Sequence, residues 1–331
     1  MIGSAVVTGA GGFVGYQLAN ALAADGQRVI GIDLHFPAAH GLLGPPKFSP
    51  VIGDFRDTAL MRAVLPGAAV LFHLAAVHLQ VGAPDSVYWD VNVHSLPRLL
   101  HLARQARVSR FVHVSSVGVY GDVGSTAANE ASVPRPQSIY GETKLAGENV
   151  VLEFGKRHAF DVVVLRPAWV YGPGCPRTAK LCRALRQRRF IVIGSGRNLR
   201  HPLYIADLIE AFRLVASSRD AAGEVFVIAG EQAVTTRELV DAVCTAFGLP
   251  HPLVRVPYAV GASVAVCMES AWRLIGQEPP FSRRTLEFFN TNNVFDISRA
   301  RAVLGFAPRY TLIAGLAATR GHIEGSIRAA A

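Results

Sequence analysis

Apolar residues in the first half of the chain form short continuous runs, which alternate with stretches where they recur every three or four positions. The runs predict buried parallel strands, and the periodic stretches predict helices that cover both faces of the sheet. The predicted strands are Ser4–Thr8, Arg28–Asp33, Lys47–Ile52, Val70–Leu74, Arg110–Ser115 and Val162–Pro167. The predicted helices lie near residues 13–24, 57–65, 85–106 and 139–157. This order predicts an α/β fold with a doubly wound parallel sheet of the Rossmann type.

The pattern changes after residue 170. The expected elements there are a basic helix at 177–189, a strand at 190–193, a helix at 207–217 and a strand at 224–229. Thr235 and Glu238 have the spacing of a capping box, which begins a further helix. We therefore predict a Rossmann domain over 1–170 and a smaller, α-rich substrate-binding domain over 171–331, with parts of 204–230 returning to the first domain.

Composition excludes several classes of protein. With 50% hydrophobic and 17% charged residues, the 331-residue chain is too apolar for intrinsic disorder. Its formal charge of +9 is spread along the chain without a basic run, so no nucleic-acid partner is expected. The longest apolar stretch, 256–268, is shorter than the roughly 20 residues of a bilayer span. It predicts a buried helix or a lid over the substrate, and no membrane partner.

The four cysteines match no zinc pattern and no dense disulfide framework. No metal is expected. The first residues show neither a basic nor an apolar segment typical of a signal peptide. These features together favour a cytoplasmic protein with reduced thiols.

Residues 8–15, between the first predicted strand and the first predicted helix, form a glycine-rich turn. Gly9 permits a tight turn, Gly12 allows a pyrophosphate to approach the backbone, and Gly15 lets helix and strand pack closely. The segment therefore predicts dinucleotide binding at the helix N-terminus. It also supplies two further expected cofactor-binding residues, Phe13 and Val14.

Carboxylates end the second and third predicted strands. Asp33 stands where a carboxylate accepts hydrogen bonds from the adenosine ribose, which favours NAD over NADP because a 2′-phosphate would meet like charge. Asp54, followed by Phe55, could reach the adenine amino group. The alternative for Asp54 is a helix N-cap, the role we expect for Asp57.

Tyr140 and Lys144 lie on one face of a predicted helix, four residues apart. A tyrosine hydroxyl with a pKa of about 10 is a poor base at neutral pH, and a nearby ammonium makes it useful by stabilising the phenolate. Ser116, at the end of the fifth strand, supplies a hydroxyl that can hold the substrate oxygen. The three residues are the predicted catalytic group.

These features together resemble the extended short-chain dehydrogenase/reductase family, the NAD-dependent epimerases and dehydratases. The resemblance covers nearly the whole chain and rests on TGAGGFVG (8–15), Asp33, GDFRD (53–57), FHLAA (72–76), VSSVGVYG (114–121), YGETK (140–144), LRPAWVYGPG (165–174) and FDISRARAVLGFAPR (295–309). It implies an NAD cofactor lined by Leu74, Ala75 and Ala76, with the nicotinamide near Pro167 and Val170 and its ribose on Lys144 and Tyr140. It also implies a homodimer that pairs the helices of 85–106 and 139–157.

Two substrate classes compete within this resemblance. Arg200 begins an Arg-x-x-x-Tyr-x-x-Asp frame that clamps the diphosphate in nucleotide-sugar enzymes. Trp169, by contrast, stands where those enzymes typically carry an asparagine. The segment around it, RPAWVYGPG (166–174), resembles the 3β-hydroxysteroid dehydrogenase branch of the family. His78 is either a substrate contact or an ordinary loop histidine, and Tyr120 is expected at the substrate together with Ser116.

The sequence therefore predicts an NAD-dependent oxidoreductase or epimerase that moves a hydride at a secondary alcohol or ketone carbon of a nucleotide sugar, as C4 epimerases and 4-ketoreductases do. Val117 and Gly118 replace the acidic pair of sugar dehydratases and argue against dehydration. One alternative is a dehydrogenase of hydrophobic alcohols. The other is a protein that senses dinucleotides without catalysis.

Overall fold

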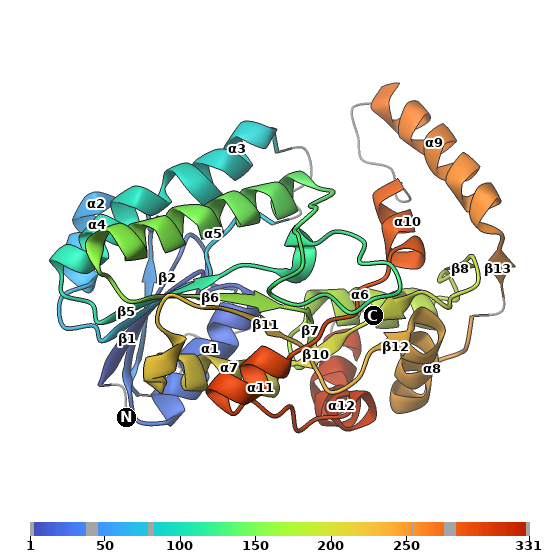
Figure 1. The fold of residues 1–331 in the computed structure, drawn as a ribbon. Coiled ribbons are helices and arrows are strands. Elements are labelled where there is room, and N and C mark those ends of the chain that lie inside the picture. The colour runs from blue at the N-terminus through green and yellow to red at the C-terminus, as the bar shows by residue number, and fades with distance from the viewer. Residues whose placement is uncertain (1–2, 38–45, 79–82, 253, 275–282, 329–331) are drawn as a thin grey trace.

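A seven-stranded parallel sheet forms the centre of the computed structural model, which describes residues 3–37, 46–78, 83–252, 254–274 and 283–328 (Figure 1). Its strands follow the order β11-β6-β5-β4-β1-β2-β3. Their bounds are β1 (Ser4–Thr8), β2 (Arg28–Asp33), β3 (Phe48–Ile52), β4 (Val70–His73), β5 (Arg110–Val114), β6 (Val162–Pro167) and β11 (Val225–Ile228). The order reverses between β1 and β4, where ligands bind in doubly wound sheets. The predicted fold class is confirmed.

Helices cover both faces of this sheet. Successive strand residues point to opposite faces, so Val6 packs in one buried cluster while Ala5 and Val7 pack in the other. One face carries α1 (Phe13–Ala24), α7 (Ile205–Ser217) and α11 (Ser298–Leu304), and the other carries α2 (Thr58–Val64), α3 (Asp85–Trp89), α4 (Leu96–Gln105) and α5 (Ile139–His158). Because β11 joins the edge beside β6, a segment from the second half of the chain completes the sheet.

The helix expected over 85–106 is interrupted by a π-helical turn. Between α3 and α4, residues Asp90–His94 form this turn, and the Ser95 amide donates to the Asp90 carbonyl at 3.1 Å, five residues back. The turn places the Asn92 side chain against the sheet edge. Its amide oxygen accepts from the Val77 amide at 2.8 Å, and its amide nitrogen donates to Thr143 Oγ1 at 3.0 Å. Asn92 therefore ties the segment after β4 to α5.

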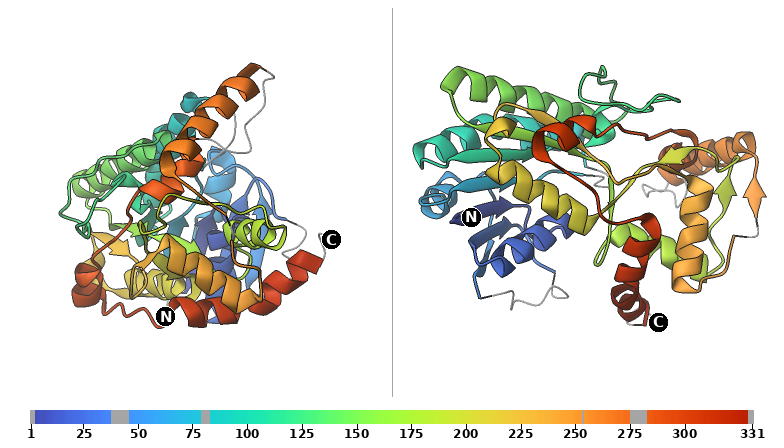
Figure 2. Two further views of the ribbon diagram at one scale, coloured as in Figure 1. Left: turned by 90° about the vertical axis from the view of Figure 1, so that its right-hand side faces the viewer. Right: turned by 60° about the horizontal axis from the view of Figure 1, so that its bottom comes forward.

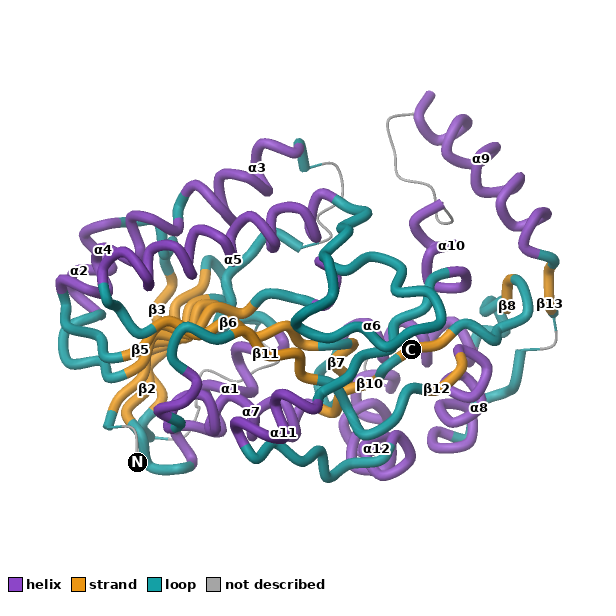
Figure 3. The backbone as a smooth tube through the Cα atoms, viewed as in Figure 1, coloured by secondary structure: helices purple, strands orange, loops and turns teal. Residues whose placement is uncertain are grey.

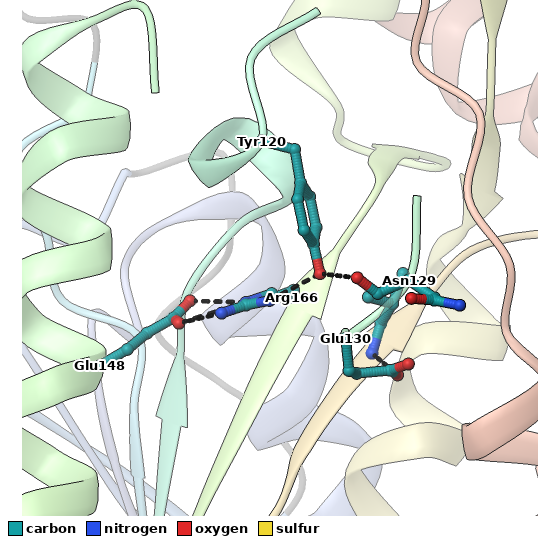
Figure 4. Close-up of polar contacts among 6 residues, drawn as sticks. Tyr120, Asn129, Glu130, Glu148 and Arg166 are labelled. Carbon is teal, nitrogen blue, oxygen red and sulfur yellow. Dashed lines mark hydrogen bonds and ion pairs between the residues drawn. The ribbon is translucent and has the colours of Figure 1, made fainter. Parts of the chain in front are cut away.

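A buried ion pair joins α5 to β6 (Figure 4). The Arg166 guanidinium donates to Glu148 at 2.6 and 3.0 Å, and the two side chains are 7% and 1% exposed. Arg166 also donates to the Tyr120 hydroxyl at 2.6 Å, which itself donates to the Asn129 carbonyl at 2.8 Å. These contacts satisfy the charges inside a low-dielectric core, where an unpaired charge is costly.

Short paired strands and helices make up the rest of the second half (Figures 2 and 3). The strand pairs are β7 (Trp169–Tyr171) with β10 (Pro202–Tyr204), β9 (Leu199–Arg200) with β12 (Val234–Thr235), and β8 (Val192–Ile193) with β13 (Arg255–Val256). The helices are α6 (Pro176–Arg186), α8 (Thr236–Phe247), α9 (Tyr258–Leu274), α10 (Arg283–Asn290) and α12 (Leu312–Arg328). The structure contains the predicted capping box of Thr235 and Glu238 at the start of α8.

The apolar stretch 256–268 forms most of α9. The expectation of a buried helix is wrong for its outer side, since Val260 is 50% and Val264 46% exposed. No helix among the described residues is long and apolar enough to cross a membrane.

Candidate active site

The glycine turn after β1 is shaped by backbone contacts that leave no room for side chains at two of its positions. Gly9 has a φ of +76°, and a Cβ on it would lie 2.6 Å from the Ala75 amide nitrogen. A Cβ on Gly15 would collide with the Gly9 carbonyl, which lies directly behind it. On Gly12, by contrast, a Cβ would meet nothing nearer than 3.4 Å. The turn is therefore closed behind and open in front, as a phosphate-binding turn must be.

A cavity of about 340 Å³ opens in front of this turn, at the carboxyl ends of the strands. Nine residues that we predicted from the sequence to bind the cofactor or the substrate line this cavity. They are Gly9, Gly12, Asp33, Asp54, Phe55, Leu74, Ala75, Ala76 and His78. The structure places the predicted residues Phe13, Val14 and Gly15 in α1 behind the turn, and Pro167 and Val170 at β6 and β7.

Asp33 is held at the cavity wall by backbone amides. One carboxylate oxygen accepts from the Gly11 amide at 2.9 Å and the other from the His35 amide at 3.3 Å. Gly11 has no room for a side chain, because a Cβ there would collide with the His35 carbonyl. Sequence reasoning assigned no task to Gly11, although it belongs to the same glycine-rich motif. Because Gly11 has no side chain, the residues that follow β2 can pack directly against the glycine turn.

Asp54 and Arg56 form an ion pair at the same wall, with a shortest distance of 2.6 Å. The hydrogen bonds from Arg56 hold the pKa of Asp54 below its usual value. Asp57 instead begins α2, where its side chain accepts from the Ala59 and Leu60 amides. Of the two cap alternatives, the structure therefore assigns the cap to Asp57 and leaves Asp54 facing the cavity.

Ser116 lies two residues after β5, at the start of a short 3-10 helix (Val117–Val119), and meets Tyr140 and Lys144 of α5. A Cβ on Gly118 would lie 3.3 Å from Ser116 Oγ and 3.9 Å from Tyr140 Cδ1, so both side chains border one point. Ser116 Oγ accepts from the Gly118 amide at 3.0 Å, which leaves its hydrogen available for donation. Lys144 follows one helical turn after Tyr140 and is 2% exposed. Among the described residues, none accepts a hydrogen bond from its ammonium group.

Burial shifts both ionisable groups of this triad. It raises the pKa of Tyr140 to about 12, while the Arg177 charge and the hydrogen bond with Ser116 act to lower it. Burial also lowers the pKa of Lys144 to about 8, and the Glu148 carboxylate opposes this shift. At neutral pH the tyrosine is therefore a proton donor and the lysine carries its charge.

Two buried histidines lie beneath Lys144. The rings of His73 and His113 stack with centroids 5.7 Å apart, and the Thr8 hydroxyl bonds His73 Nδ1 at 2.7 Å. Burial and the Lys144 charge lower the pKa of His73 to about 3 and that of His113 well below its usual value. Both imidazoles are neutral at pH 7, so neither adds a repelling charge beside Lys144.

Arg177 reaches the same point from the second half of the chain. It lies in the first turn of α6, and its guanidinium is 2.8 Å from His78 Nε2. The His78 ring meets the Tyr140 ring edge-on, with centroids 4.4 Å apart. Sequence reasoning missed Arg177, since an arginine in an ordinary basic helix carries no signal of its own. Only the packing of α6 shows that it stands beside Tyr140.

The other expected substrate residues lie outside the lining of the cavity. Trp169 is half-buried in β7 and stacks on Tyr171 with centroids 5.9 Å apart. Arg200 is 8% exposed, donates to the Phe288 carbonyl and lies 4.7 Å from the centre of the Phe288 ring. Tyr120 is 3% exposed, and its hydroxyl accepts a hydrogen bond from the buried Arg166 guanidinium. We therefore leave Tyr120 out of the proposed substrate site.

Comparisons with known proteins agree with this geometry. The model of the NAD dependent epimerase/dehydratase family matches residues 5–229. The chain is 30% identical over 95% of its length to a 4-hydroxy-2-methyl-3-oxo-4-farnesyl-3,4-dihydroquinoline-1-oxide ketoreductase of Stigmatella aurantiaca, 95% of which is covered. It is 31% identical over 95% of its length to a UDP-glucose 4-epimerase of Mycolicibacterium smegmatis, 96% of which is covered. The structure of MoeE5 in complex with UDP-glucuronic acid and NAD is 29% identical, with a TM-score of 0.78 and coverage of 99% of this chain and 100% of that one.

Proposed function

The chain belongs to the NAD dependent epimerase/dehydratase family, and from this premise we propose that it moves a hydride at a secondary alcohol or ketone carbon of a nucleotide sugar. The observation that carries the proposal is the meeting of Ser116 and Tyr140 at one point, with Lys144 one helical turn away and the glycine-lined cavity alongside. Each group needed for proton movement is present, which argues against a sensor that has lost its chemistry.

The residues at the cavity fit NAD. The open face of Gly12 accommodates the pyrophosphate, and the Asp33 carboxylate stands where it can accept from the adenosine ribose. The Lys144 ammonium has no acceptor among the described residues and would hold the nicotinamide ribose, as the family resemblance implies. When bound, NAD supplies the acceptor or donor of the hydride.

The triad moves the proton that accompanies the hydride. With a pKa of about 12, the Tyr140 hydroxyl donates its proton to a substrate carbonyl oxygen in the direction of reduction. In the direction of oxidation, the Arg177 charge, which acts to lower the pKa of Tyr140, would stabilise the phenolate that receives the proton, and the family resemblance implies the same role for Lys144. The Ser116 hydroxyl, whose oxygen is occupied by the Gly118 amide, donates to the reacting oxygen and keeps it in place.

A nucleotide sugar is supported by the relatives and by the Arg200 frame. The test is calorimetric titration of the NAD-loaded protein with UDP, comparing wild type, Arg200→Ala and a control variant, Arg197→Ala, which changes an exposed arginine nearby. A charge-assisted contact contributes about 1.5–3 kcal/mol, so we expect Arg200→Ala to weaken UDP binding by about 10- to 100-fold. Equal binding by wild type and Arg200→Ala would refute the assigned diphosphate contact.

A hydrophobic ketone is the second candidate, because Trp169 presents a large apolar surface at β7 and one relative is named as a ketoreductase of a farnesylated ring. Absence of UDP binding, together with binding of a steroid alcohol that Trp169→Ala removes, would favour this candidate over the first.

We also propose a cytoplasmic homodimer, which pairs α3, α4 and α5 of two copies. The family resemblance supports it, and these helices lie together on one outer face of the sheet (Figure 1). Sedimentation velocity measures the assembly, and a monomer at micromolar concentration would contradict it.

A further inference from the structure

Exposed apolar side chains are concentrated at one end of the second half of the chain. Among the described residues, ten large hydrophobic side chains are exposed, and six of them belong to this end. We call these six the α9 patch. Its members and their exposed fractions are Ile191 (43%), Val254 (52%), Tyr258 (38%), Val260 (50%), Val264 (46%) and Val266 (46%).

The members of the α9 patch lie on elements that are directly connected. The Val192 amide donates to the Val254 carbonyl at 3.2 Å, so the pairing of β8 with β13 brings Ile191 beside Val254. Helix α9 follows β13 directly and rises from it at the end of the molecule (Figures 1 and 2). The six residues thus come from one strand pair and from the helix that leaves it.

Helix α9 is apolar on its outer side as well as its inner side. Inward, Ala265 is fully buried with Ile193, Leu286 and Phe289, and a Cβ on Gly261 would lie 2.8 Å from Ile193. The rest of the helix surface carries the exposed residues Val260, Val264 and Val266, together with Ala259, Ser263 and Cys267. The Ser263 hydroxyl donates to the Ala259 carbonyl at 3.1 Å. A surface helix normally turns charged residues outward, and residues 258–268 have none.

Four arginines lie on the segments that lead into β8 and α9. Arg186, Arg188 and Arg189 lead into Phe190, whose ring packs on Phe289 of α10 with centroids 6.0 Å apart. Arg255 lies on β13, immediately before the helix. All four arginines are exposed, and none has an ion pair or a side-chain hydrogen bond with another described residue. The apolar α9 patch is therefore accompanied, on the segments that lead into it, by four arginines without an ion pair to any described residue.

We propose that the α9 patch docks on the surface of an anionic phospholipid bilayer. The valines enter the boundary between headgroups and acyl chains, and the four arginines contact the lipid phosphates, as peripheral amphipathic segments do. A second copy of this chain is the weaker occupant. A two-fold interface brings the same patch against itself, and that would set four unpaired arginines against four others.

The proposal rests on α9 and its neighbours and is independent of the catalytic activity. The test is flotation of the NAD-loaded protein with vesicles of equimolar phosphatidylglycerol and phosphatidylcholine, and with vesicles of phosphatidylcholine alone. We expect binding to the anionic vesicles only. Each basic residue near the surface contributes about 1 kcal/mol, so the triple variant R186Q/R188Q/R189Q should partition about 100-fold more weakly. The double variant V260E/V264E should lose binding to a comparable degree.

Matched controls separate the patch from general effects of charge. V133E/I313E makes the same change at two exposed apolar residues elsewhere, and R62Q/R98Q/R219Q removes three exposed arginines elsewhere. Both controls should float like wild type. Equal melting temperatures would show that all variants are folded, as expected for exposed positions.

Three outcomes would overturn the proposal. The first is a wild-type protein that does not float with anionic vesicles. The second is V260E/V264E that floats as wild type does. The third is a wild-type dimer that V260E/V264E converts to monomer in sedimentation velocity without any vesicle binding, because the α9 patch would then be a self-interface.

Discussion

Residues 1–170 bury a lysine, two histidines and a glutamate–arginine ion pair. Residues 171–331 bury Arg200, His201 and Asp207, and they also carry a cluster of exposed valines and of arginines without ion pairs among the described residues. A buried ion pair fixes the elements that it joins, so Glu148 and Arg166 hold α5 against β6 in one arrangement. Surface valines and arginines need no fixed partner and leave the second half free to meet different ligands. The comparison suggests that reaction type is determined by the first half and ligand choice by the second.

The largest effect that would test this division is on turnover. Tyr140→Phe removes the hydroxyl that moves the proton and leaves the ring against His78. General acid–base catalysis contributes about 100- to 10,000-fold, so we expect a loss of that size in kcat with NAD affinity retained. Single-turnover kinetics and calorimetry measure the two quantities. Turnover within a few-fold of wild type would assign the chemistry to another group.

A second test compares ion pairs from the two halves. Glu148→Gln leaves the buried Arg166 guanidinium without its counter-charge and should lower the free energy of unfolding by about 3–5 kcal/mol. Glu231→Gln breaks the Glu231–Arg301 pair, whose side chains are 48% and 45% exposed. That change should cost no more than about 1 kcal/mol. Urea denaturation gives both values, and equal losses would erase the contrast between the halves.

The smallest expected effect is a pH dependence. Lys144 is charged below its pKa of about 8 and loses its charge as the pH rises through this value. In the direction of ketone reduction, the rate should therefore fall by about tenfold per pH unit above the pKa. Lys144→Arg keeps its charge at these pH values, so its profile should be flat there. A wild-type profile that is also flat would remove the lysine charge from the mechanism.

Much of the first half could be predicted because its strands are continuous apolar runs. The ends of β1, β2 and β6 agree with the sequence interpretation, and β3, β4 and β5 differ by one residue. The glycine turn and the proposed catalytic group of Ser116, Tyr140 and Lys144 could be singled out because their chemistry lies in short motifs. The π-helical turn could not, since Asp90–His94 shows no break in the helical pattern of its neighbours.

The second half was predicted less well because its contacts join distant segments. Arg177 lies near Tyr140 because of how α6 packs, and the residues around position 177 form no motif that predicts this contact. Arg200 lies outside the lining of the cavity, and its guanidinium donates to the Phe288 carbonyl, far along the chain. The exposure of Val260 and Val264 depends on which elements pack against α9, and the residues on its inner side come from β8 and α10. Local patterns contain none of this information.

The π-helical turn before α4 has a consequence for insertions and deletions. A π turn uses about one residue more than an α turn, so the helix here accommodates a surplus residue within one turn. Deleting one residue from 90–94 would let the helix close into regular α geometry while its two flanks keep their inward faces. What would be lost is the reach of Asn92 to Val77. The hydrogen bonds between Asn92 and Val77 at the cavity wall thus depend on the number of residues in this one turn. A one-residue deletion would remove these hydrogen bonds while the helix itself still forms.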